Sequence, residues 1–133
     1  MAREAGPTNQ TGVWQGLYSY PRAFEPVSFV ATLIETQSRV SGSTHEPHRK
    51  TGATLCATLL GRRDGDAVSF LKTYDAPESG YSADVRYEGA VSADATEIEG
   101  RWIIRADWFG RFLMVRIAHD AEKIARKKFA RVR

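Results

Sequence analysis

The fold of this chain is decided by Ile98-Glu99-Gly100-Arg101-Trp102-Ile103-Ile104, a short break at Asp107-Trp108-Phe109-Gly110, and Arg111-Phe112-Leu113-Met114-Val115-Arg116-Ile117. Apolar residues recur at alternate positions on both sides of the break. Two such runs joined by a few residues are typical of a β-hairpin. Every earlier strand candidate in the chain repeats this pattern, so the hairpin indicates the plan of the whole domain.

Six further strands are predicted before the hairpin. They cover residues 13–20, 27–35, 40–46, 54–61, 67–74 and 84–91. Asp64-Gly65 is a dipeptide that supplies the positive φ of a tight hairpin turn. The longest break, at residues 75–82, contains Pro77 and Gly80 and predicts a loop at one end of the domain.

Eight short strands with brief turns and no helical run between them predict an all-β domain. A meandering antiparallel sheet of eight strands closes most simply into an up-and-down barrel, because closure removes the exposed sheet edges. The alternative is a two-sheet β-sandwich, since the strand pattern alone does not count sheets.

The two ends of the chain differ from this β pattern. Residues 1–12 are polar and predict a flexible tail, and the barrel domain is expected over residues 13–118. In residues 119–133, Asp120 can cap a helix whose apolar face is formed by Ala121, Ile124, Ala125, Phe129 and Val132. This basic helix carries six Lys or Arg against two acidic residues. We expect it to pack on the barrel wall; the alternative is contact with an acidic membrane or with nucleic acid.

The composition is that of a single globular domain. The 133 residues are 42% hydrophobic and 26% charged, and no apolar run approaches the length of a membrane span. The first ten residues lack a signal-peptide pattern. Cys56 is the single cysteine, which excludes an internal disulfide. These features together predict a cytoplasmic protein.

Lys72 is the sharpest functional candidate in the sequence. Strand alternation places its side chain on the inward side of the barrel with Val68 and Phe70. A lysine in an apolar interior is costly unless it is paired or neutral. Its partner could be a tyrosine hydroxyl, Glu46, or the acidic group of a ligand, and we adopt the ligand as the working hypothesis. The alternative is that the amine reaches water from the end of its strand.

Several aromatic residues share the inward side with Lys72. Tyr18, Tyr74, Tyr87 and Trp102 could line a pocket with apolar bodies and polar tips. The alternative is that they are core residues only. The predicted ligand-binding set is therefore Tyr18, Lys72, Tyr74, Tyr87 and Trp102.

Other kinds of site find little support. His45, Glu46 and His48 cluster in sequence, but they lie around a proline and not on one helical face, so no metal site is predicted. There is no Gly-x-Ser-x-Gly elbow, and Cys56 has no obvious base beside it. No glycine-rich phosphate loop follows a strand. Neither a catalytic residue nor a cofactor is assigned.

Thr11-Gly12-Val13-Trp14 resembles the Gly-x-Trp opening of the calycin superfamily, which includes lipocalins and avidins. The resemblance implies an eight-stranded barrel closed at one end by Trp14 beneath Arg116. The Thr-Asp-Tyr element of lipocalins and the polar biotin ligands of avidins are absent. The overall string, with Trp-x-Gly-x-Tyr and Phe-x-Lys-x-Tyr, also resembles a family of small uncharacterised bacterial proteins, a likeness that implies no activity.

Three functions remain open at this point. The first is a small-molecule binding barrel whose apolar or aromatic ligand carries an acidic group that meets Lys72. The second is a small barrel enzyme, such as an isomerase or cyclase, with acid–base groups in the lumen. The third is an interaction module with a filled core. The binder and the enzyme differ in whether an ionisable pair meets at one spot, and the sequence predicts no oligomeric state.

Overall fold

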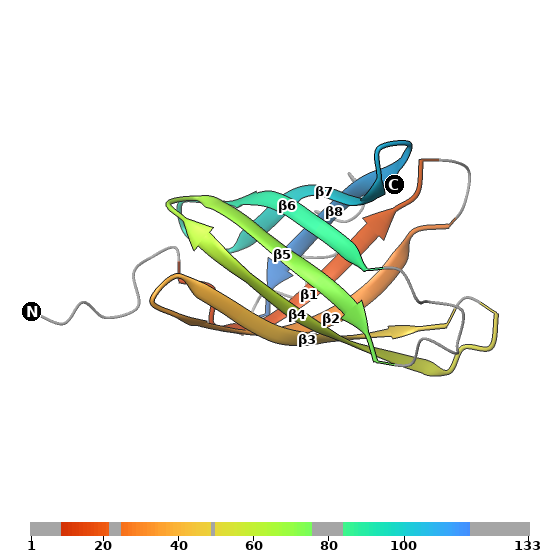
Figure 1. Cartoon of the computed structure of the whole chain (residues 1–133). Helices are drawn as coiled ribbons and strands as arrows, with labels where there is room; N and C mark the ends of the chain where they lie inside the picture. Colours follow the sequence, from red (N-terminus) through yellow and green to blue (C-terminus); the bar gives the residue numbers. More distant parts are fainter. Residues whose placement is uncertain (1–8, 22–24, 49, 76–83, 118–133) are drawn as a thin grey trace, which may run out of the picture.

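The computed structural model describes residues 9–21, 25–48, 50–75 and 84–117, and these form eight strands (Figure 1). The strands are β1 (Gly12–Ser19), β2 (Val27–Thr36), β3 (Arg39–Pro47), β4 (Thr54–Asp64), β5 (Ala67–Tyr74), β6 (Val85–Val91), β7 (Glu97–Arg105) and β8 (Trp108–Arg116). The described residues contain no helix, and so none that could span a membrane.

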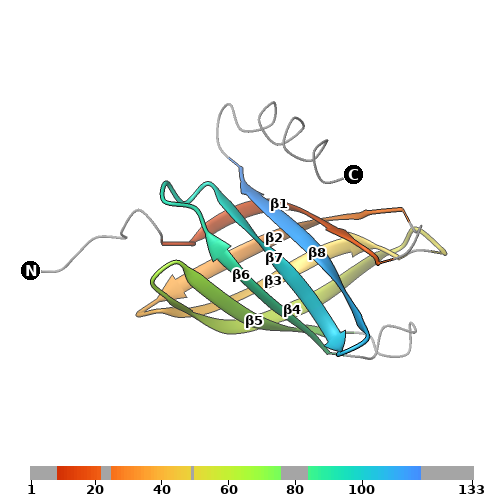
Figure 2. The ribbon, with the colours of Figure 1, turned by 90° about the horizontal axis from the view of Figure 1, so that it is seen from above.

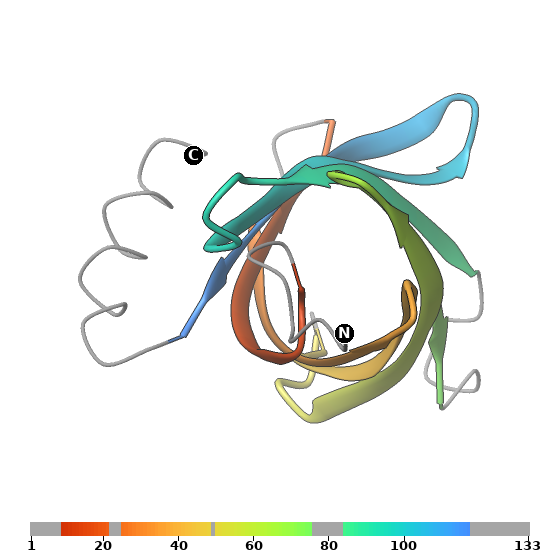
Figure 3. The same ribbon diagram turned by 90° about the vertical axis from the view of Figure 1, so that its left-hand side faces the viewer.

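The eight strands form a closed antiparallel barrel in sequence order. Each strand pairs with the next, and β1 pairs with β8 to complete the ring (Figure 3). The predicted eight-stranded up-and-down barrel is therefore confirmed, and the sandwich alternative is excluded. Closure leaves no strand of the sheet with an unpaired edge.

Alternation of side chains explains why the sheet curls around one interior. In β2 the buried residues are Val27, Phe29, Ala31, Leu33 and Glu35, and an exposed residue follows each of them. The Asp64-Gly65 turn forms the β4–β5 hairpin as predicted, with Gly65 at a φ of 64°. Gln37 and Ser38 also have positive φ, at 52° and 69°, in the β2–β3 turn. Two consecutive positive φ values suit the twist of a two-residue hairpin.

The middle of the barrel is occupied by side chains. Eighteen buried residues, contributed by β1–β8 and by Ala95, form one contiguous cluster. Phe70 stacks on Tyr87 with 5.4 Å between ring centres, and Tyr87 meets Phe112 edge-on at 4.9 Å. Such aromatic pairs stabilise the fold beyond the burial of their area.

The two ends of the barrel are built differently (Figure 2). At one end, here called the turn end, the β2–β3, β4–β5 and β6–β7 connections are short. At the other, here called the loop end, the β1–β2, β3–β4 and β5–β6 connections are longer, and only the β7–β8 connection is short. Residues 9–11, grouped with the tail in the sequence prediction, lie at the turn end, where Gln10 is fully buried. The helix predicted for residues 119–133 lies outside the described residues.

Candidate ligand-binding site

Lys72 on β5 and Glu46 on β3 form a buried ion pair inside the barrel. Their side chains are each about 1% exposed, and Lys72 Nζ donates to Glu46 Oε1. Glu46 is one position and Lys72 two positions before the last residue of its strand, at the loop end. A buried charge needs a partner of this kind, because removal from water is otherwise too costly.

Two tyrosine hydroxyls also donate to the Glu46 carboxylate. Tyr18 Oη lies 2.6 Å from Oε2, and Tyr74 Oη lies 3.1 and 3.2 Å from Oε1 and Oε2. Three donors around one carboxyl group are the arrangement that suits its ionised form, which can only accept. Glu46 is thus the centre of a polar group of four side chains from β1, β3 and β5, here called the Glu46 cluster.

Aromatic rings surround the amine of Lys72. Its Nζ lies 4.7 Å from the centre of the Tyr74 ring and 5.1 Å from that of Tyr18. Phe29 and Tyr87 stand at 5.4 and 5.7 Å. Ring faces within about 6 Å attract a cation electrostatically. The amine is therefore held by one carboxylate and four rings.

Burial shifts the pKa values of this group. Loss of water lowers the pKa of Lys72, and the contact with Glu46 opposes that shift. Burial raises the pKa of Tyr18, Tyr74 and Tyr87 above the usual value for a phenol. The three tyrosines accordingly remain neutral at physiological pH, and Tyr18 and Tyr74 keep the protons that they donate to Glu46.

Trp102 belongs to an aromatic group that continues from the Glu46 cluster. Its Nε1 donates to the Ser19 carbonyl at 2.8 Å, and its side chain is 3% exposed. Trp102 packs edge-on against Tyr18, Tyr20 and Trp108, with ring centres 5.6–6.4 Å apart. Tyr20 and Trp108 are only partly buried, so this group extends from the core toward the loop end.

The structure brings the predicted residues Tyr18, Lys72 and Tyr74 together around Glu46. Tyr87 adds a ring to this set, and Trp102 stands in the adjoining aromatic group. The partner of Lys72 is thus Glu46, one of the three considered, in place of the ligand acid of the working hypothesis. Sequence reasoning missed Glu46 as the centre, although alternation from Val40 and Thr44 directs Glu46 inward too.

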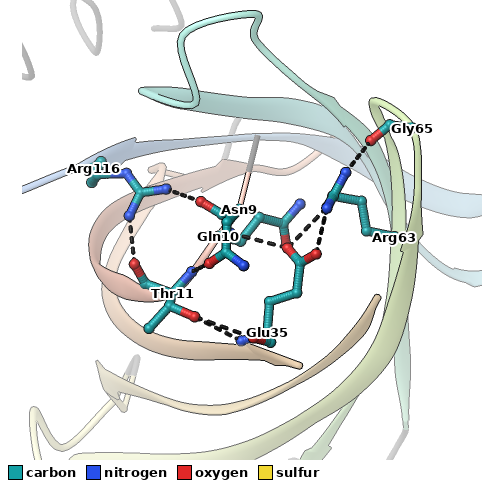
Figure 4. Close-up of polar contacts among 7 residues, drawn as sticks. All are labelled: Asn9, Gln10, Thr11, Glu35, Arg63, Gly65 and Arg116. Carbon is teal, nitrogen blue, oxygen red and sulfur yellow. Dashed lines mark hydrogen bonds and ion pairs between the residues drawn. The ribbon is translucent and has the colours of Figure 1, made fainter. Parts of the chain in front are cut away.

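Trp14 and Arg116 meet at the turn end of the barrel. The guanidinium carbon of Arg116 lies 4.5 Å from the centre of the Trp14 ring, and the two residues are register partners in β1 and β8. Arg116 also donates to the Ala95 carbonyl at 2.8 Å. It donates to the carbonyls of Thr11 and Asn9 at 2.5 Å each (Figure 4). Burial lowers the pKa of Arg116. This arginine therefore ties residues 9–11 to the barrel.

A second ion pair strengthens the turn end (Figure 4). Arg63 Nε donates to both carboxylate oxygens of Glu35, at 2.9 and 2.8 Å, and this contact raises the pKa of Arg63. Glu35 also accepts from the backbone N–H of Gln10 at 3.0 Å. The Gln10 carbonyl accepts from Trp14 Nε1 at 2.9 Å. These bonds hold residues 9–11 at the turn end, where an open pocket is lined by Ser38, Arg63, Val68 and Gly89 among others. The candidate site is placed at the loop end because the Glu46 cluster lies there beneath partly buried aromatic rings.

The residues considered for metal binding or nucleophilic catalysis lie apart from this site. No group of three or more His, Cys, Asp or Glu that could hold a metal occurs within residues 9–21, 25–48, 50–75 and 84–117. His45 and Cys56 are exposed on the outer wall, and His48 Nδ1 accepts from the Lys50 N–H in a loop.

Comparisons with known proteins establish the architecture alone. No family model matches the chain, and no curated protein matches it. A solved structure of a redesigned β-barrel is 11% identical, with a TM-score of 0.67 over 90% of this chain and 100% of its own. Another redesigned barrel, solved with the small molecule DFHBI bound, is 9% identical, with a TM-score of 0.65 over 86% of this chain and 100% of its own. The chain is similar to these proteins in being a small eight-stranded antiparallel β-barrel.

Proposed function

We propose that this protein binds a small apolar or aromatic molecule at the loop end of its barrel, above the Glu46 cluster. The observation that carries the proposal is the buried Lys72–Glu46 pair. Apolar side chains of similar volume usually serve stability as well as a buried ion pair does. Small-molecule sites are usually lined by aromatic side chains together with a few polar groups, and the Glu46 cluster beside partly buried aromatic rings fits that description.

The contacts of Lys72 argue for a neutral ligand in place of the acidic one expected from the sequence. Glu46 already supplies the negative charge beside the amine. An acidic ligand would bring a second anion close to Glu46, where like charges repel strongly in a medium of low dielectric constant. A hydroxyl or carbonyl group could instead share hydrogen bonds with Lys72, which has three N–H donors.

Packing supports the loop end, and not the whole lumen, as the place of binding. The middle of the barrel is filled by the apolar cluster described above. Tyr20, Tyr74 and Trp108 are partly buried and pack against that cluster. The similar barrel that holds DFHBI supports small-molecule binding in general. The proposal retains the calycin resemblance and the cytoplasmic location expected from the sequence.

Matched naphthalene probes test this proposal by isothermal titration calorimetry. 2-Naphthol and 2-naphthoate share an apolar body and differ in charge at neutral pH. We expect 2-naphthol to bind and 2-naphthoate to bind at least tenfold more weakly. Glu46→Gln combined with Lys72→Met keeps the site neutral while removing the ion pair, and it should weaken 2-naphthol binding.

Lys50→Met provides the control, because Lys50 is an exposed loop lysine. That variant should bind 2-naphthol as the parent does. Absence of heat with both probes, or equal affinity of the parent and the double variant, contradicts the proposal. Circular dichroism and thermal melts check that each variant is folded.

An acid–base enzyme is the second candidate, because an ionisable pair does meet at one spot. Glu46 could remove a proton from carbon, and Lys72 could stabilise the enolate oxygen that forms. The test uses 2-tetralone, an aromatic ketone, in D₂O. The C–H bond next to the carbonyl breaks, Glu46 takes the proton, and deuterium from solvent replaces it. Exchange above the buffer rate that is lost in Glu46→Gln supports this candidate, and exchange at the buffer rate rejects it.

A further inference from the structure

The outer surface of β2–β5 differs in charge from the rest of the barrel. In the stretches 28–34, 41–45, 56–60 and 69–73, no outward-facing side chain of these four strands is Asp, Glu, Lys or Arg. Exposed surfaces of soluble domains ordinarily carry charges of both signs throughout. Here this area is called the uncharged face.

The opposite wall has the ordinary charged surface. Outward positions of β6–β8 hold Arg86, Glu88, Glu99 and Arg111, which form ion pairs at 3.7 Å. Both walls are antiparallel β-sheet, so secondary structure does not explain why one wall carries charged side chains and the other does not. Depletion of charge is a compositional mark of the centre of protein–protein interfaces.

Strand register aligns the side chains of the uncharged face in rows. One row is apolar apart from a serine and runs through Ile34, Ser41, Leu60 and Leu71. Ile34 and Leu60 are 54% and 67% exposed, and they have no packing role inside the barrel. The adjacent row carries only hydroxyls, from Thr32, Ser43, Thr58 and Thr73.

The ends of the uncharged face carry opposite charges. Arg39 and Arg62 are register partners at the turn end, and both are exposed. Asp75 is exposed toward the loop end, where its N–H donates to the Cys56 carbonyl and its Oδ1 accepts from Thr58 Oγ1 at 3.2 Å. A second copy, turned about a two-fold axis that lies in the interface and crosses the strands, sets its Asp75 end opposite this Arg62 end.

We propose that the uncharged face is the interface of a symmetric homodimer. A second copy fits because it brings no like charges onto the central rows, and because hydroxyls both donate and accept. The two-fold arrangement uses the same patch on both subunits and pairs the two arginines with the aspartate at each end. A charged partner of another kind would leave its charges unpaired against the central rows. This inference does not depend on the proposed ligand.

Sedimentation equilibrium of the full chain across the micromolar range tests the proposal. The parent is expected to approach twice the monomer mass of 14.8 kDa. Leu60→Lys places a charge in the centre of the face at an exposed position, so it should give a folded monomer. Ala90→Lys adds the same charge at an exposed position of β6 and should leave the dimer intact.

Charge exchange tests the orientation of the two copies. Asp75→Arg should weaken association at least tenfold, and Arg62→Asp added to it should restore much of the loss. If the unsubstituted protein is monomeric throughout the micromolar range, the homodimer proposal is wrong and the uncharged face would bind a different partner. A dimer that survives Leu60→Lys but dissociates with Ala90→Lys also overturns it. Thermal melts of each variant separate loss of association from loss of folding.

Discussion

Glu46 and Lys72 face each other from β3 and β5, with β4 between their strands, and neither side chain reaches solvent. One carboxylate, one amine and two phenols thereby share a single spot beside the apolar cluster of the barrel. The stability of the protein should depend on all four side chains, because each is a hydrogen-bond or ion-pair partner of another and its loss leaves a buried polar group unpaired.

Breaking the pair on one side should be costly. We expect Lys72→Met to lower the free energy of unfolding by about 3–5 kcal/mol, because Glu46 is left as an uncompensated buried charge. Glu46→Gln should have a similar cost through the unpaired amine. The double variant should lose less than the sum of the two single losses. Urea denaturation measures all three, and strict additivity would show that the charges are not coupled.

The Trp14–Arg116 contact should show coupling of a different origin. Trp14→Ala removes a fully buried indole and should cost about 3–5 kcal/mol. Arg116→Ala should cost less, since its guanidinium is partly exposed. A double-mutant cycle should give about 0.5–2 kcal/mol of interaction, which is the range of cation–π contacts. A coupling energy of zero would refute an energetic role for the stacking.

Alkaline pH should unfold the protein through its buried tyrosines. Tyr18, Tyr74 and Tyr87 have a raised pKa in the folded state, so each contributes stability that is complete below about pH 10 and is lost as pH rises further. Each group should remove about 1.4 kcal/mol per pH unit above that value. Absorbance at the phenolate band and circular dichroism should change together. Ionisation of all tyrosines with native circular dichroism would contradict the prediction.

Deletion of residues 119–133 should lower the melting temperature. Leu17, Leu113 and Val115 are 2–5% exposed, although strand alternation directs them to the outer wall at the β1–β8 seam. We expect the apolar side of the segment 119–133 to cover them. Differential scanning calorimetry compares the truncated and full chains, with replacement of three tail lysines by glutamine as a control for charge alone. An unchanged melting temperature on truncation would show that the segment does not stabilise the barrel.

Strand order and barrel closure could be predicted because the signals are local. Alternation in β2 and β5 directs Phe29 and Lys72 inward, and the Asp64-Gly65 pair predicts a hairpin from two residues. The β2–β3 turn is different, since Gln37 and Ser38 adopt positive φ without the usual glycine or asparagine. The sequence predicts a turn at residues 37–39, between the strands 27–35 and 40–46, but these residue types do not indicate its positive φ values.

The candidate site could be predicted only in part, because its centre depends on register between distant strands. Lys72 and its tyrosines were visible through alternation. Glu46 is the last residue of the predicted strand 40–46 and is one of three possible partners of Lys72 in the sequence, which does not decide among them. The choice of Glu46 follows from the register that places β3 and β5 on opposite sides of β4. The same applies to Glu35 and Arg63, which are 28 positions apart in the chain.

The pairing of β1 with β8 has a consequence for how fast the protein folds. Arg116 bonds the Thr11 carbonyl across 105 positions of sequence, whereas every other strand pair joins neighbours in the chain. The hairpins can form early, but the ring is completed only when β1 pairs with β8, and the loop-closure entropy of that long-range pairing slows this step. Until then two open edges are exposed to other chains. Closure of the seam is therefore the step at which folding competes with aggregation.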